Sequence, residues 1–152
     1  MNLAKTSTGI PAMSSEAIAT VRNLEAMAME YPQEPFMTHH VIHGGVYLRT
    51  LRMVSGSLLT GALIKISTTL IVSGDVTIYM DAQPVRITGY HVLPASAGRK
   101  QAILAHEDTD LTMLFGTDAK SVEDAEAEFT DEVSILASNK DDGSNTIMVT
   151  GE

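Results

Sequence analysis

The stretch from Tyr47 to Phe115 constrains the fold most strongly, because short apolar runs alternate there with residues that favour tight turns. The runs are rich in valine, isoleucine, leucine and threonine, and glycine, proline, serine and aspartate separate them. Strand-length runs at this spacing are typical of a β-sandwich or a small barrel, and they disfavour βαβ units. We therefore predict a mainly β fold, a small β-barrel or jelly-roll sandwich.

The predicted strands follow directly from these runs and their boundaries. Ser73-Gly74-Asp75 is predicted to be a tight hairpin turn, and Gly89 is predicted to break the chain between two short strands. The predicted strands span residues 36–43, 46–54, 58–63, 68–72, 76–80, 85–88, 90–93, 99–105 and 110–116.

The N-terminal end is predicted to add an extended arm, Met1 to Met13, and a helix that Ser14 caps. The helix carries one apolar stripe, which either packs on the sheet or binds a partner, with Met27 and Met29 as soft contacts. Tyr31-Pro32 ends this helix. The stripe consists of Ile18, Val21, Leu24 and Met27.

The C-terminal end is predicted to add a short helix and an arm. Ser121-Val122-Glu123-Asp124 has the capping-box pattern and opens the helix, which continues to about Phe129. Residues 146–150 alternate as a strand would, with Ile147 and Val149 on one face, and could pair with their own sheet or with a neighbour's. The expected organisation is an arm and helix in 1–35, a barrel in 36–118, and a helix and arm in 119–152, together forming one globular domain.

Composition excludes several classes of function. The chain has 152 residues and a formal net charge of -9, which argues against binding to nucleic acid or to an anionic membrane surface. The acidic residues between Glu123 and Glu132 are expected to form a solvated helix face. Cysteine is absent, so a disulfide or a cysteine-based zinc site is excluded. We see neither an apolar run of membrane-spanning length nor a signal peptide, and we expect a cytoplasmic location or assembly into a particle.

Histidines are the main candidates for metal chemistry. His39 and His43 share one face of a predicted strand, but no carboxylate lies near them in sequence, and histidines at an edge or interface would show the same pattern. His91 is expected to be a packed or hydrogen-bonded core residue. His106 begins a polar cluster at a strand end, where Asp108 could instead accept bonds from backbone amides. A nucleophile elbow and a phosphate-binding loop are both missing from the sequence.

Five short motifs carry a family resemblance. They are Pro32-Gln33, Gly45-Val46-Tyr47-Leu48-Arg49, Leu59-Thr60-Gly61, Ser73-Gly74-Asp75 and Ala105-His106-Glu107-Asp108-Thr109. With residues 61–74 and 89–98 in the places of the two cupin motifs, the chain resembles the cupin superfamily. More narrowly, over residues 23–129, it is similar to a cupin-like protein of tailed bacteriophages and prophages. The resemblance implies a cupin-like β-barrel.

The metal ligands of that phage group are replaced in this chain. Where the group has His-Lys-Thr-Glu-His, the sequence reads Ile64-Lys65-Ile66-Ser67-Thr68, and Arg99-Lys100 stands where a third histidine would fall. A cupin metal needs three or four nitrogen or oxygen ligands that face one point. We therefore expect a degenerate cupin with neither a metal nor another cofactor, and not an enzyme.

Three functions remain open from the sequence. The first is a non-enzymatic phage particle protein in the virion (a decoration, cement or tail-associated subunit), which self-associates and binds other particle proteins. Its expected interaction surface comprises Ile18, Val21, Leu24, Met27, Ile147 and Val149. The second is a metal-free module for a sugar or an anion, whose possible pocket comprises His39, Tyr47, Lys65, Arg99 and His106. The third is a metal-dependent cupin enzyme, which would require His39 or His43 to converge on His106.

Overall fold

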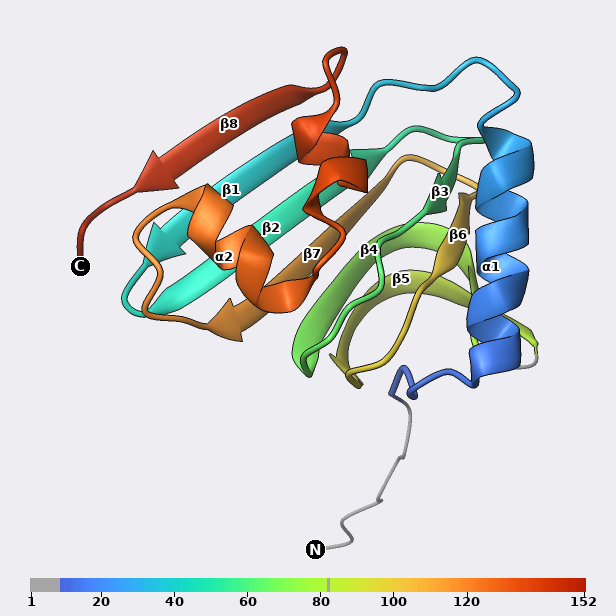
Figure 1. Ribbon diagram of the computed structural model, residues 1–152, viewed down its shortest axis with the longest axis horizontal. Helices are drawn as coiled ribbons and strands as arrows, with labels where there is room; N and C mark the ends of the chain where they lie inside the picture. The colour runs from blue at the N-terminus through green and yellow to red at the C-terminus, as the bar shows by residue number, and fades with distance from the viewer. Residues whose placement is uncertain (1–8, 82) are drawn as a thin grey trace, which may run out of the picture.

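The computed structural model describes residues 9–81 and 83–152 and has two α-helices and eight strands within them (Figure 1). The helices are α1 (Ser15–Ala28) and α2 (Val122–Phe129), and two short 3-10 helices follow α2, η1 (Val133–Ile135) and η2 (Ala137–Asn139). The strands are β1 (Met37–His43), β2 (Val46–Met53), β3 (Leu58–Thr60), β4 (Thr68–Tyr79), β5 (Pro84–Ala95), β6 (Ala102–Ala105), β7 (Thr109–Gly116) and β8 (Ser144–Val149).

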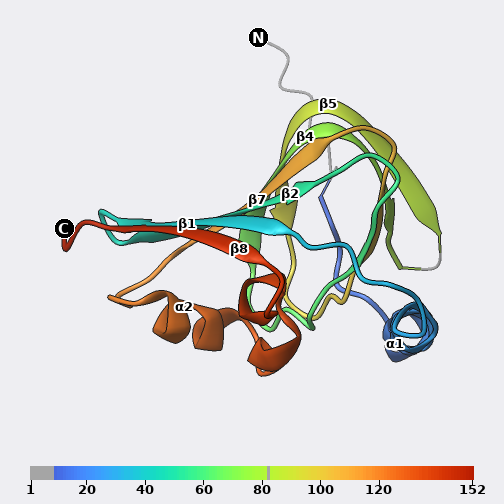
Figure 2. The same cartoon turned by 90° about the horizontal axis from the view of Figure 1, so that it is seen from above.

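The strands form one curled sheet with the order β3-β6-β4-β7-β2-β1-β8, and β5 pairs with β4. The long strand β4 explains this arrangement. Residues 69–73 of β4 pair with β7 and residues 76–79 pair with β6, while β5 pairs along its entire length. Figures 1 and 2 show that β4 and β5 arch strongly, whereas β1, β2 and β8 form a flatter wing. The predicted mainly β class is therefore confirmed.

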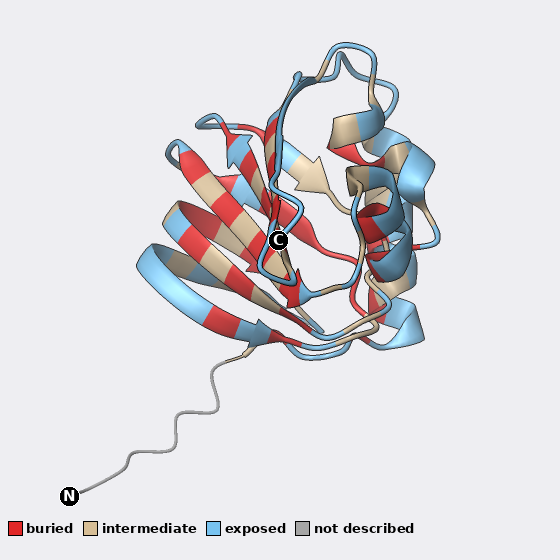
Figure 3. Cartoon of the chain, turned by 90° about the vertical axis from the view of Figure 1, so that its left-hand side faces the viewer, coloured by how far each residue is buried: buried red, intermediate tan, exposed pale blue. Residues whose placement is uncertain are grey.

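The core lies on the concave side of this sheet, where alternate residues point inward. Figure 3 shows the resulting bands of buried and partly buried residues along the strands. On β2 and β7 the inward positions include Tyr47 and Phe115, whose ring centroids lie 5.5 Å apart in an edge-to-face arrangement. Phe129 from α2 stacks on Tyr47 at 6.4 Å. The end of α2 is thus fixed to the sheet by an aromatic cluster.

The predicted hairpin turn at Ser73-Gly74-Asp75 and the predicted break at Gly89 are both wrong. Each glycine lies in the middle of a continuous strand, and the two face each other in the β4–β5 pairing. A Cβ on Gly74, where φ is +149°, would lie 2.2 Å from the Oγ1 atom of Thr109. Gly74 is therefore required by the close approach of β7 and not by a turn. The chain reverses later, where the Met80 amide donates to the carbonyl of Gln83 at 3.0 Å.

Helix α1 begins as predicted. The Oγ atom of Ser14 accepts a hydrogen bond from the amide of Ala17 at 3.1 Å, which satisfies one of the free N–H groups of the first turn. The apolar stripe packs on the protein's own sheet, and Val21 is 1% exposed against Ala102. Val21 is consequently a core residue and unavailable to a partner. Ile18 and Leu24 are half-buried in the same cluster, while Met27 is 63% exposed.

The C-terminal segment is integrated into the sheet. Ser121 caps α2 as predicted, since its Oγ atom accepts from the amide of Asp124 at 3.1 Å. The expected solvated acidic face is only partly correct, because Glu126 is buried. Strand β8 pairs in parallel with β1, which answers the question of whether this strand joins its own sheet.

The predicted N-terminal arm lies partly outside the described residues, namely at 1–8. Within the described part, Ile10 is buried and forms a parallel bridge with Ala95 at the end of β5. In residues 9–81 and 83–152, neither α1 nor α2 has the length and apolar character needed to cross a bilayer.

Candidate functional site

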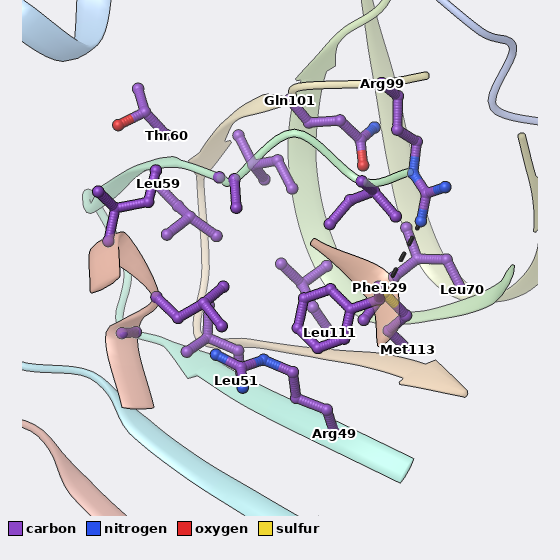
Figure 4. Close-up of a pocket in the computed structure, with 17 residues that line it drawn as sticks. Arg49, Leu51, Leu59, Thr60, Leu70, Arg99, Gln101, Leu111, Met113 and Phe129 are labelled. Carbon is purple, nitrogen blue, oxygen red and sulfur yellow. Dashed lines mark hydrogen bonds between the residues drawn. The ribbon is translucent and has the colours of Figure 1, made fainter. Parts of the chain in front are cut away.

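A cavity of about 120 Å³ lies inside the curled sheet and is open to solvent on one side (Figure 4). Its walls are mainly apolar and come from strands β2, β4, β6 and β7, from the loop after β3, and from the segment after α2. The apolar lining includes Leu51, Leu70, Ile103, Leu111, Met113 and Phe129. Three long polar side chains complete the lining, Arg49, Arg99 and Gln101.

Arg99 enters the cavity from the loop between β5 and β6. An antiparallel bridge to Ile64 fixes its backbone, with the Ile64 amide donating to the Arg99 carbonyl at 2.8 Å. The side chain is 1% exposed, and both terminal nitrogens donate to neutral oxygens: Nη1 to the Ser96 carbonyl at 2.8 Å and Nη2 to Thr68 Oγ1 at 2.7 Å. Burial lowers the pKa of Arg99 to about 10, so the guanidinium is still protonated at pH 7.

Two buried donors at this cavity lack an acceptor within the described part of the chain. They are the Nε atom of Arg99 and the Nε2 atom of Gln101. The backbone of Gln101 is held in place because its carbonyl accepts from the amide of Gly61 at 2.8 Å. Figure 4 shows both side chains in the upper part of the view, with Leu111, Phe129 and Met113 below them. Buried donors normally find a partner, so these two atoms are exceptions among the described residues.

Arg49 differs from Arg99 because it has a carboxylate partner. Its Nη1 atom donates to Glu126 Oε2 at 2.8 Å and to Ser138 Oγ at 3.0 Å, and its guanidinium carbon lies 5.6 Å from the centre of the Phe129 ring. Glu126 also accepts from the hydroxyl of Ser138. The pair is nearly inaccessible to solvent and carries no net charge. Arg99 is therefore the lining residue with an uncompensated positive charge.

Of the five residues predicted to form a pocket, Arg99 alone lines this cavity. Tyr47 is fully buried in the aromatic cluster, and its hydroxyl is 2.8 Å from Nδ1 of His40. Lys65 pairs with Asp131 at 2.6 Å on the surface. His39 and His106 bind Thr146 on β8 and Thr77 on β4, respectively. The predicted set is thus distributed over separate parts of the molecule.

The described residues do not fit the metal that a cupin barrel would imply. Among them, three or more histidine, cysteine or acidic side chains never gather closely enough to hold an ion. His43, like His39, bonds a threonine of the C-terminal segment, Thr150 at 2.7 Å, and so neither converges on His106. His91, predicted to be a core residue, is exposed. Ile64 lines the cavity and Thr68 holds Arg99.

Sequence reasoning missed Arg49, Gln101 and Phe129 as cavity residues. Arg49 could have been found, because it lies between Tyr47 and Leu51 at the inward positions of an alternating strand. Gln101 lies just before β6, and Phe129 reaches the cavity only because α2 folds back over the sheet. The local sequence pattern therefore gives no indication that Gln101 or Phe129 lines a cavity.

A second hollow, about 460 Å³, separates α2 and the 3-10 helices from β8. Its inner polar groups already have partners. His40 bonds Tyr47 Oη at 2.8 Å and Asn145 Oδ1 at 2.9 Å, and Glu126 is held by Arg49. Burial lowers the pKa of His40, which favours the neutral ring that this hydrogen-bond pattern satisfies. This hollow therefore offers little to a polar ligand.

Comparisons with known proteins give fold similarity alone. No protein-family model and no curated protein matches the sequence. Similar solved structures include a cupin superfamily protein from Desulfitobacterium hafniense, with 15% identity over 73% of this chain and 100% of that one and a TM-score of 0.48. An RmlC-like cupin family protein with a double-stranded β-helix fold from Methanocaldococcus jannaschii is 11% identical over 56% and 83% of the two chains, with a TM-score of 0.46. KdgF from Halomonas sp. is 15% identical over 51% and 76%, with a TM-score of 0.42. The chain is similar to these cupins in architecture, and their activities are not transferred to it.

Proposed function

We propose that the protein is a non-enzymatic, metal-free binding module that takes a small ligand into the cavity inside its curled sheet. The observation that carries this proposal is a cavity of about 120 Å³ in a core that should otherwise be close-packed. The lining is mostly apolar with a few convergent polar groups, which is the usual composition of a small-molecule site. At about 30 Å³ for each water-sized group, the cavity holds roughly four such groups, and a longer ligand can extend through its open side.

A thermal-shift screen of the purified protein tests this proposal. The library contains neutral and anionic compounds of about four to ten non-hydrogen atoms, so that the smaller ones fit within the cavity and the larger ones extend through its open side. A ligand at about ten times its Kd stabilises the folded state by about 1.4 kcal/mol, which raises Tm by roughly 3–6 °C for a chain of this length. We expect at least one compound to reach this shift.

A variant that fills the cavity supplies the control. Ala62 is buried and lines the cavity, so Ala62→Leu should remove the ligand-dependent shift. Ala19→Leu, on the exposed face of α1, should retain it. A library without any stabilising compound, or an equal shift in Ala62→Leu, would contradict the proposal.

The second candidate is a structural subunit of a bacteriophage particle, which is the function implied by the sequence resemblance. It is favoured by β8, an edge strand with every residue exposed and without a charged side chain. Ile147 and Met148 are 61% and 62% exposed. Exposed apolar edges pair readily with another chain. In this role the protein would bind copies of itself and other particle proteins in the virion, and would bind neither nucleic acid nor membrane.

Light scattering and particle proteomics separate this candidate from a monomeric module. We expect the wild type to form an oligomer and Met148→Lys to shift it to the monomer, because a lysine blunts an edge strand. Met29→Lys is the matched control, since Met29 is 61% exposed at the C-terminal cap of the distant helix α1. A monomeric wild type that is also absent from purified particles would exclude the candidate.

A further inference from the structure

We infer that the cavity is a site for a small aliphatic monocarboxylate, whose carboxylate is held by Arg99 and Gln101. This inference rests on the proposed function and specifies the chemical class of its ligand. It is carried by the charge of Arg99, by the two donors without a partner on the lining residues Arg99 and Gln101, and by the apolar character of the remaining wall.

The first step is the missing counter-ion of Arg99. The structure places no carboxylate within 4.0 Å of its guanidinium among residues 9–81 and 83–152, and the remaining positions, 1–8 and 82, contain neither Asp nor Glu. A charge that is 1% exposed and unpaired is unfavourable by several kcal/mol. An anion bound at Arg99 removes this penalty.

The second step is the number of free donors. Three buried side-chain nitrogen or oxygen atoms lack a partner in the described residues, and two of them, Arg99 Nε and Gln101 Nε2, belong to residues that line this cavity. A carboxylate only accepts hydrogen bonds and has two oxygens, so one carboxylate can use both donors. A dianionic phosphate ester would leave a second negative charge in a buried site that contains one uncompensated cation.

The third step places the ligand. Arg49 already binds Glu126 at 2.8 Å, so the anionic end belongs at the Arg99 rim. Figure 4 shows the apolar side chains of Leu70, Leu111 and Phe129 beyond that rim. The carboxylate and the first carbons of an aliphatic chain fill the roughly four water-sized positions, and the rest of the chain extends through the open side of the cavity.

Three probes with the same carbon skeleton test the inference: hexanoate, hexanamide and hexan-1-ol, each titrated calorimetrically into the full chain at pH 7.5. We expect hexanoate to bind at least about tenfold more tightly than either neutral probe, since a hydrogen bond between charged groups is stronger than one between a charged and a neutral group. Arg99→Met should abolish this preference, and Gln101→Leu should reduce it. Arg52→Met, which removes an exposed arginine of β2, should leave it unchanged.

The outcomes separate this inference from the proposed function. Equal binding of all three probes, or a preference that persists in Arg99→Met, overturns the carboxylate assignment while the cavity remains a binding site. Tighter binding of hexyl phosphate than of hexanoate also overturns it. If no hexyl probe binds, the carboxylate inference fails. The wider thermal-shift screen then shows whether the cavity binds any other small ligand. If Arg99→Met does not fold, the preference for hexanoate is measured in Gln101→Leu instead, and an unreduced preference there overturns the assignment.

Discussion

The buried ion pair between Arg49 and Glu126 provides the sharpest test of how the interior is stabilised. The substitution Glu126→Gln keeps the shape of the side chain and can still accept from Arg49 and Ser138, but it removes the negative charge. Arg49 then remains as a cation with a side chain that is 9% exposed and without a counter-ion. Phe129 below the guanidinium replaces only part of the lost attraction.

The expected cost is about 3–5 kcal/mol in the free energy of unfolding, the usual effect of removing one partner from a buried ion pair. A domain of this size is normally stable by about 5–15 kcal/mol, so the variant should lose between about a fifth of its stability and all of it. The corresponding decrease in Tm is roughly 6–20 °C. Replacing both partners, as in Arg49→Met with Glu126→Leu, should recover most of this loss because it leaves no buried charge unpaired.

Urea unfolding followed by far-ultraviolet circular dichroism measures these differences, and an unchanged m-value shows that the comparison is valid. The matched control is Asp110→Asn, which breaks the pair between Arg52 on β2 and Asp110 on the neighbouring strand β7. That pair is about half exposed and should contribute less than about 1 kcal/mol. Equal effects of Glu126→Gln and Asp110→Asn would refute the reasoning, because burial would then make no difference to the pair.

Three further predictions concern stability. Gly74→Ala should destabilise the fold by about 1–3 kcal/mol in urea unfolding, because the added Cβ would lie 2.2 Å from Thr109 Oγ1; a change below about 0.5 kcal/mol would contradict the close approach. Ser121→Ala should lower the free energy of unfolding by about 1 kcal/mol, because α2 loses its N-terminal cap. An unchanged free energy of unfolding would exclude that role for Ser121. Burial lowers the pKa of His40 in the folded state, so its stabilising effect is complete above the unfolded value of about 6.5 and is lost as pH falls. His40→Gln, which can still bond Asn145, should therefore show a smaller loss of stability between pH 7.5 and 5 than the wild type, and identical pH profiles would refute this.

The fold could be predicted because the sequence of each strand shows, by its alternation of apolar and polar residues, which face points inward. Tyr47 and Leu51 on β2, and Leu111 and Phe115 on β7, alternate with half-exposed residues and indicate one buried face each. The same local rules failed at Gly74, because the close approach of a strand 35 residues later in the chain requires a glycine there. Turn chemistry and a close approach of backbones require the same residue type, so sequence alone could not separate them.

The candidate site was much harder to predict. Arg99 was identified, but as one of five polar residues that the fold then places apart. The acidic segment after Ser121 looked solvated, and the burial of Glu126 depends on Arg49, which is 77 positions away. A charged side chain becomes a core residue only through such a partner, and partners of this kind have no local sequence signal.

The contrast between Arg49 and Arg99 separates structural charge from charge that is available to a ligand. Both guanidinium groups line the same cavity, but Arg49 meets a carboxylate, a hydroxyl and an aromatic ring, and these contacts account for its position. Arg99 meets two neutral oxygens and leaves Nε without an acceptor in the described residues. An apolar side chain would fill the position of Arg99 at lower cost, since burial of a lone cation opposes folding. The position of Arg99 is therefore explained by stability alone far less well than that of Arg49, and an anion in the cavity supplies the interaction that the protein itself does not.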